Sequence, residues 1–136
     1  MGKLPERRRF HRFPFHAAGV LLVPNVGPLA CELVDVSISG ALVLLPSSVG
    51  RIAGRHPRLD LVMRNSGDSG EAGICVTVAA VWQSKEQLGC RFLGVDPESF
   101  VRLKALVEDH LGDPLLLDRE LARLNYWPGV ETGVRL

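Results

Sequence analysis

Residues 29–46, LACELVDVSISGALVLLP, contain two apolar segments joined by a short polar turn. Hydrophobic and polar side chains alternate in residues 29–36, and residues 41–45 form an apolar run that ends at Pro46. Alternation with a period of two residues is typical of a strand with one buried face, and serine and glycine are typical of turns. The stretch therefore predicts two strands with a tight connection at residues 37–40.

Four more apolar segments lie on either side of this pair. Residues 20–23 end at the turn-forming sequence PNVGP, and residues 58–64, 73–82 and 88–93 are also separated by polar stretches. Short strands in sequence, spaced by turns, are typical of antiparallel barrels and sandwiches. We therefore predict a mainly-β domain with six antiparallel strands.

The periodicity changes to three or four residues after the sixth segment. Asp96 and Pro97 form a helix start, with an N-cap acceptor and a proline at the first helical position, and Gly112 suits a C-cap. Asp113 and Pro114 repeat the start signal. The apolar stripes of the two predicted helices are Phe100, Leu103, Leu106, Val107 and Leu111, and then Leu117, Leu121 and Leu124. We expect the first helix to cover the barrel and the second to pack on the domain or on a partner.

The chain length of 136 residues is typical of one domain with enough apolar surface to form its own core. Two prolines and a high density of charge predict a flexible basic arm over residues 1–14. The barrel and its helix are expected in residues 15–112, and a second helix with a loose tail in residues 113–136.

The composition is that of a globular protein with almost no net charge. Hydrophobic residues make up 46%, charged residues 23%, and the formal net charge is +1, so we expect no nucleic acid polymer as a partner. No apolar run approaches the roughly 20 residues of a membrane helix, and the first residues lack a signal-peptide pattern. We therefore expect a cytoplasmic protein without membrane insertion. Cys31, Cys75 and Cys90 are too widely spaced for a metal site and are expected to be small buried side chains.

The positive charge is concentrated in one run before the first strand. RRRFHR, residues 7–12, holds four guanidinium groups within six positions. Arginine recognises phosphate and base edges with paired N–H donors. In isolation the run is more typical of a solvated basic tail. Several guanidiniums acting on one small anion would nevertheless reach micromolar affinity, about 8 kcal/mol.

The second candidate element is DVSISG, residues 35–40, in the predicted turn. Asp, Ser and Gly occur in many connections between strands, so this element alone does not indicate a binding site. Together with arginines, the element is suited to recognise guanine. A carboxylate accepts from the N1 and N2 edge of this base, and arginine donates to O6 and N7. Serine donates to phosphate, and glycine allows close approach of the backbone. The two elements together indicate a pocket for a small anion that carries bases.

The pair RxxxR (residues 8–12) and DxSxxG (residues 35–40) resembles the two-part motif of PilZ domains, receptors for the bacterial second messenger cyclic di-GMP. In that family the first motif precedes a six-stranded barrel, the second lies on its surface, and a helix follows. The resemblance extends over residues 6–111 and implies a PilZ-type β-barrel that binds cyclic di-GMP. The second predicted helix is similar to that of stand-alone PilZ adaptors, which implies a relay to an unidentified effector protein.

The resemblance also implies a role for each motif residue. Arg8 and Arg12 are expected to contact guanine and phosphate. Asp35 and Ser37 are expected against the second guanine side, and Gly40 is expected to allow the close backbone approach.

Four further residues are secondary candidates. Arg7 occupies a position where an arginine is similar to family members that bind an intercalated dimer of cyclic di-GMP. Trp82 is expected either to stack near a base or to fill the barrel core. Arg9 adds charge without a defined role. His11 is expected to be exposed and uninvolved, the alternative being that it makes the affinity pH-sensitive.

Other classes of function fit the sequence less well. Catalysis is not expected, because the four histidines lack the spacing of a triad or metal site and no glycine loop with lysine is present. A PilZ-like scaffold that does not bind nucleotide would not need both motifs. A barrel that binds single-stranded nucleic acid would need a basic groove with several aromatics, whereas aromatic residues make up 6% of this chain.

Overall fold

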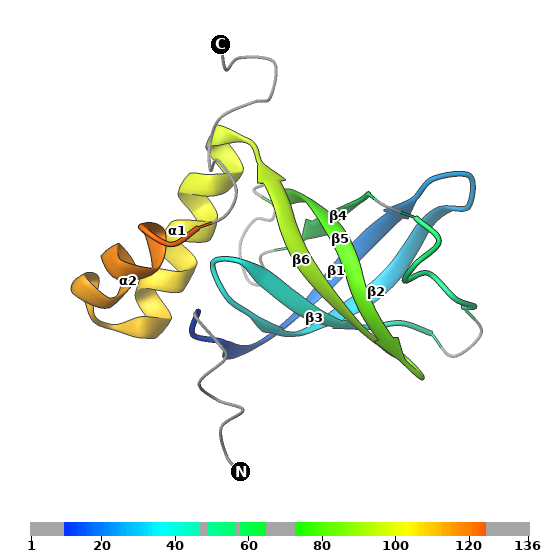
Figure 1. Cartoon of the computed structure of the whole chain (residues 1–136), viewed down its shortest axis with the longest axis horizontal. Helices are drawn as coiled ribbons and strands as arrows, with labels where there is room; N and C mark the ends of the chain where they lie inside the picture. Colours follow the sequence, from blue (N-terminus) through cyan, green and yellow to red (C-terminus); the bar gives the residue numbers. More distant parts are fainter. Residues whose placement is uncertain (1–9, 47–48, 57, 65–72, 125–136) are drawn as a thin grey trace.

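The structure, a computed structural model, describes residues 10–46, 49–56, 58–64 and 73–124. Its strands form one closed antiparallel barrel in the order β1-β2-β3-β6-β5-β4 (Figure 1). The strands are β1 (Phe13–Val23), β2 (Gly27–Val36), β3 (Gly40–Leu44), β4 (Leu59–Met63), β5 (Ile74–Ser84) and β6 (Gln87–Val95). The predicted six-stranded antiparallel domain is confirmed, and it is a barrel rather than a sandwich.

The barrel interior is filled by apolar side chains from alternate strand positions. Residues that are fully buried there include Leu21, Leu33, Val43, Leu61 and Leu88. The connection between β3 and β4 lies at the end of the barrel remote from the helices (Figure 1). It is held by Gln83, whose Oε1 accepts from the backbone N–H groups of Ile52 and Ala53 at 2.7 and 3.0 Å. Ile52 and Ala53 are buried, so this loop adds to the core.

β1 begins earlier than the sequence suggested. We expected an arm over residues 1–14, but Phe13 is already in the strand, where it is buried and pairs with Val36. Burial of the Phe13 ring explains the difference, because it stabilises the extended backbone at this point. Pro14 is tolerated since β1 pairs with β4 only from Gly19 onward and a bulge follows Pro14. Residues 10–12 of the expected arm are described and contact the domain through Phe10, His11 and Arg12, whereas residues 1–9 lie outside the described residues.

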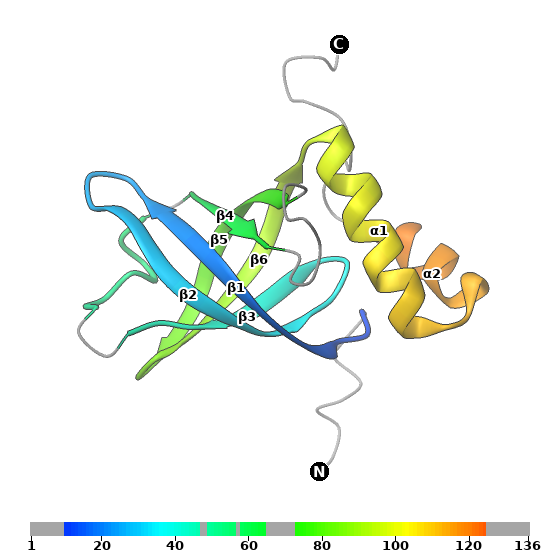
Figure 2. The same ribbon diagram turned by 180° about the vertical axis from the view of Figure 1, so that it is seen from behind.

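Two helices lie at one end of the barrel (Figure 2). α1 (Pro97–Leu111) begins at Asp96, whose carboxylate accepts from the N–H of Ser99 at 2.8 Å, and ends at Gly112 with φ 71°. Both caps agree with the prediction. The buried Ser99 hydroxyl accepts from the N–H of Cys75 at 2.9 Å, which joins α1 to β5.

The second helix, α2 (Pro114–Leu121), begins at the predicted N-cap, Asp113. It packs on the domain through Leu117, which is 2% exposed, while Leu115 is 68% exposed. Of the two positions expected for this helix, on the domain or on a partner, the structure shows the first. The predicted tail beyond residue 124 lies outside the described residues. Within the described segments, no helix combines the length and apolarity needed to cross a membrane.

The three cysteines differ in burial, which corrects the expectation that all are buried. Cys90 is buried and Cys31 half-buried, but Cys75 is exposed because it occupies an outward position between the buried Ile74 and Val76. Burial raises the pKa of the Cys31 thiol from 9.0 to about 11. Burial, with a smaller contribution from Cys31, raises the pKa of Cys90 to about 12.

Alkylation at about pH 8 is expected to modify Cys75 at least tenfold faster than Cys31 or Cys90, because the thiolate is the reactive form and burial limits access. The folded pKa of Cys90 lies above 9.0, so its contribution to stability is complete below pH 9 and decreases as the pH rises toward 12. Peptide mass spectrometry after timed labelling gives the rates. Denaturant unfolding on either side of pH 9 gives the stability. Equal native labelling rates for Cys75 and Cys90 would contradict this assignment.

Candidate functional site

Parts of both predicted motifs line one cavity on the outer surface of the barrel. The cavity measures about 300 Å³. Its lining includes Phe10 and Arg12 before β1, Ser37 and Gly40 at the β2–β3 turn, Trp82 of β5 and Arg91 of β6. Cavities of about 430 and 530 Å³ elsewhere on the barrel contain none of the predicted site residues. The cavity at the motifs is therefore the candidate site, and we call it the motif pocket.

Arg12 forms an ion pair with the first residue of the second motif. Its Nη1 lies 3.7 Å from Oδ1 of Asp35, and this oxygen is buried without a hydrogen-bond partner among the described residues. At that distance the pair is electrostatic rather than a hydrogen bond, so the contact with Asp35 leaves the guanidinium N–H donors of Arg12 available for an anion. Asp35 holds Arg12 at the rim without lining the pocket itself.

Ser37 shapes the turn between β2 and β3. Its buried hydroxyl oxygen accepts from the N–H groups of Ser39 and Gly40 at 3.0 and 3.1 Å. The backbone of Ser37 donates to the carbonyl of Gly40 at 2.8 Å, which closes the turn. Ser37, which we expected to lie against a guanine, therefore stabilises the turn without any ligand. Its contact with a ligand stays a prediction.

Gly40 is required by the packing of β3 against β6. A Cβ atom at this position would lie 2.5 Å from the carbonyl oxygen of Cys90 in the neighbouring strand. We expected Gly40 to allow the close approach of a ligand. Within the described structure, the group that lies close to Gly40 is the backbone of β6.

Trp82 lies on the outside of the barrel, where its side chain is 41% exposed. A register shift between Ala80 and Trp82 interrupts the alternation of β5, and both Val81 and Trp82 are exposed. Trp82 pairs across the strands with Gly89, and its indole occupies the space above that glycine. The alternative of a core tryptophan is thus wrong, and an aromatic face borders the motif pocket.

Arg91 and Phe10 are among the residues of the pocket that were not predicted. Arg91 pairs with Gly40 across β3 and β6, so it brings a second described guanidinium to the pocket. Phe10 packs partly against the core while it lines the pocket. The alternation of buried and exposed positions in β6 predicts that Arg91 points outward. Only the pairing of β6 with β3 shows that Arg91 lies beside the second motif.

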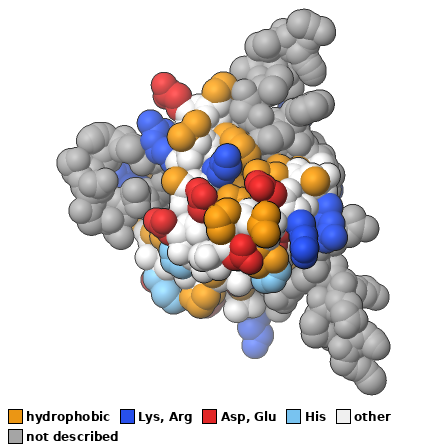
Figure 3. Space-filling model, turned by 90° about the vertical axis from the view of Figure 1, so that its left-hand side faces the viewer, with side chains coloured by type: hydrophobic (Ala, Val, Ile, Leu, Met, Phe, Trp, Pro, Cys, Tyr) orange, Lys and Arg blue, Asp and Glu red, His pale blue; other side chains and the backbone are white. Residues whose placement is uncertain are grey.

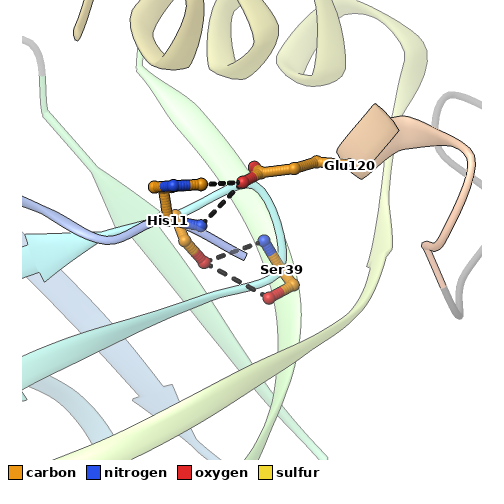
Figure 4. Close-up of polar contacts among 4 residues, drawn as sticks. His11, Ser39 and Glu120 are labelled. Carbon is orange, nitrogen blue, oxygen red and sulfur yellow. Dashed lines mark hydrogen bonds and ion pairs between the residues drawn. The ribbon is translucent and has the colours of Figure 1, made fainter. Parts of the chain in front are cut away.

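The remaining candidates are divided between described and undescribed parts of the chain. Arg7, Arg8 and Arg9 lie outside the described residues. His11 has an exposed ring, as expected, but it is not uninvolved, because its backbone N–H and ring contact Glu120 of α2 (Figure 4). Within the segments that the structure describes, no group of three or more His, Cys, Asp or Glu side chains is placed to hold a metal ion.

The solved structures that resemble this fold include the following two. The inhibitor of motility MotI/DgrA from Bacillus subtilis superposes with a TM-score of 0.60 at 13% identity, over 79% of this chain and 52% of that one. The chain thus spans about half the length of the Bacillus protein. The PilZ domain of YcgR from Escherichia coli, determined with c-di-GMP, gives a TM-score of 0.58 at 21% identity, over 85% and 94% of the two chains.

At these identities the structural comparison concerns the fold alone. The sequence comparison goes further, because the model of the PilZ domain matches residues 6–109. This match covers most of the chain and includes the whole barrel, both motifs and nearly all of α1. The chain therefore belongs to the PilZ domain family.

Proposed function

We propose that this protein is a non-enzymatic receptor for cyclic di-GMP, which binds at the motif pocket and changes a surface that a partner protein recognises. The observation that supports the proposal most directly is that Arg12, Trp82 and Arg91 border one cavity beside the DxSxxG turn. Membership of the PilZ family and the fold shared with the YcgR domain agree with it.

The chemistry of the pocket suits a ligand with two guanines and two phosphates. The guanidiniums of Arg12 and Arg91 offer paired donors for phosphate or for guanine O6 and N7. The exposed indole of Trp82 offers a flat face for stacking, which contributes about 1–3 kcal/mol per base in comparable sites. Asp35, which pairs with Arg12 beside the pocket, carries an acceptor that suits the guanine N1 and N2 edge.

In this proposal the residues before β1 take part in ligand binding and contribute the remaining arginines. Arg8 completes the RxxxR motif, and Arg9 adds positive charge. Arg7 favours an intercalated dimer of the ligand over a monomer. Binding favours the conformation of the protein that contacts the ligand, because a ligand shifts an equilibrium by its differential affinity for the two states.

Calorimetric titration of the full chain with cyclic di-GMP tests this function. We expect a micromolar dissociation constant, with two ligands per protein if the dimer binds and one if the monomer binds. Cyclic di-AMP is the matched control, because adenine lacks the guanine O6 acceptor and N1–H donor. We expect it to bind at least about 100-fold more weakly.

The tryptophan fluorescence of a Trp127→Phe variant gives a second measurement, since the remaining tryptophan, Trp82, borders the pocket. Its emission is expected to change on addition of cyclic di-GMP and to stay constant with cyclic di-AMP. A calorimetric signal without any change in Trp82 emission would argue for binding elsewhere on the barrel.

A nucleotide-independent scaffold is the second candidate function. It is favoured by the finding that Ser37 and Gly40 have structural roles that need no ligand. Absence of any binding signal up to millimolar cyclic di-GMP would support this candidate and refute the receptor function.

A further inference from the structure

A buried carboxylate of α2 contacts the chain segment that leads into β1. Glu120 is 2% exposed, and its Oε2 accepts from the backbone N–H of His11 at 2.8 Å and lies 2.5 Å from the ring Nδ1 of the same residue (Figure 4). The other carboxylate oxygen, Oε1, is buried without a hydrogen-bond partner among the described residues. Burial of a carboxylate is unfavourable unless specific contacts compensate it. The contact with His11 is therefore a specific one rather than a loose surface ion pair.

The same segment also contacts the other helix. The ring of Phe13 stacks on His110 of α1, with ring centres 4.1 Å apart and planes inclined by 8°. The His110 Nδ1 lies 3.0 Å from the carbonyl oxygen of Leu106 in the same helix. Residues 10–13, which we call the junction, are therefore fixed by both helices at the point where the arm enters the barrel.

The junction includes part of the RxxxR motif. His11 lies between Arg8 and Arg12, and its neighbours Phe10 and Arg12 both line the motif pocket. The backbone N–H of His11 belongs to the same short segment, so its bond to Glu120 restricts where Phe10 and Arg12 lie. Glu120 does not line the pocket itself, but it contacts the segment that supplies two of the lining residues.

The helix that supplies Glu120 depends on its docking. α2 has eight residues, and an isolated helix of that length is marginal in water. Its fully buried apolar contact is made by Leu117, while Leu115 points to solvent. On the helical face of the molecule, hydrophobic side chains are interspersed with acidic and basic ones (Figure 3). Leu121 also packs partly against the core, but Leu117 and Glu120 are the two buried residues of this helix, so we expect the loss of Glu120 to weaken its docking.

We propose that Glu120 is a positioning residue that couples the docking of α2 to ligand binding at the motif pocket. When α2 is docked, Glu120 holds His11 and keeps Arg12 at the pocket. When the ligand holds Arg12, it stabilises the docked position of α2 in return, because coupling between two sites is reciprocal. The inference rests on the proposed receptor function for its ligand, and it identifies α2 as the element whose surface changes.

Three variants of α2 test the coupling by calorimetric titration of the full chain with cyclic di-GMP. Glu120→Ala removes the contact and is expected to lower the affinity about tenfold. Glu120→Gln keeps the shape and an acceptor for the His11 N–H, so we expect it to restore part of the affinity. Asp118→Ala is the matched control, because it removes a carboxylate from an exposed position of the same helix. Its affinity should equal that of the wild type, and equal losses in Glu120→Ala and Asp118→Ala would overturn the proposal.

Hydrogen exchange measured on the same proteins separates positioning from general destabilisation. Without ligand, Glu120→Ala should exchange faster than the wild type at the junction and α2 but not in β5 and β6. Cyclic di-GMP should slow exchange of α2 in the wild type and much less in Glu120→Ala. Faster exchange throughout the barrel, or no ligand effect on α2 in the wild type, would overturn the coupling.

The two measurements also distinguish this inference from the function on which it rests. If the wild type does not bind cyclic di-GMP, the receptor function and the coupling to it are both wrong. The ligand-free exchange rates then still show whether Glu120 holds the junction. If the wild type binds and Glu120→Ala binds equally well, only the coupling is wrong.

Discussion

Replacement of Arg12 by alanine is expected to lower the affinity for cyclic di-GMP at least about 100-fold while the barrel stays folded. A hydrogen bond from a charged donor contributes about 1.5–3 kcal/mol, and two such bonds from one guanidinium account for the loss. The variant also leaves the carboxylate of Asp35 without its positive partner at the rim of the pocket. That negative charge then opposes the phosphates of the ligand.

The measurement is a calorimetric titration, with Arg55→Ala as the matched control. Arg55 is exposed in the loop between β3 and β4 and does not line the motif pocket, so its removal changes the net charge equally without touching the site. Arg12→Lys keeps the charge but not the planar pair of donors, and we expect it to fall between the wild type and Arg12→Ala. Unchanged affinity in Arg12→Ala would show that the ligand does not use the pocket. The same loss is predicted for Arg8→Ala.

The elements of this fold were predictable where the signal is local. The helix starts at Asp96 and Asp113 and the C-cap at Gly112 follow from residues that interact within one helical turn. The six strands follow from short alternating segments bounded by turn formers. The start of β1 was not predicted, because it depends on the burial of Phe13 against residues that are distant in the sequence.

The site was predictable from its motifs but not in its geometry. Residue types and order led to Arg12 and Gly40, and both line one cavity. The outward position of Trp82 depends on a bulge in β5, which the regular spacing of apolar residues does not show. Arg91 and Glu120 reach the motifs through strand register and helix docking, which link positions far apart in the chain. Such contacts require the three-dimensional structure.

Gly40→Ala is expected to destabilise the barrel by about 2–3 kcal/mol, the upper part of the range for overpacked sites. The added Cβ would lie 2.5 Å from the carbonyl oxygen of Cys90, and this oxygen belongs to backbone that cannot move away as a flexible side chain can. Gly40 pairs with Arg91 across the two strands, so a shift of β3 from β6 would also open the motif pocket. Denaturant unfolding should show the loss of stability, and the melting temperature should fall by roughly 10 °C.

Gly94→Ala provides the control that separates this steric effect from the general effect of replacing a glycine in a strand. Gly94 lies in β6, and a Cβ atom there would have no neighbour within 4 Å. Its replacement should leave the stability unchanged or raise it by up to about 1 kcal/mol, because alanine restricts the unfolded chain. If Gly40→Ala were as stable as Gly94→Ala but failed to bind cyclic di-GMP, the glycine would serve the ligand, as the motif alone suggested. A loss of stability in the absence of ligand shows instead that this motif position is required by the contact between β3 and β6.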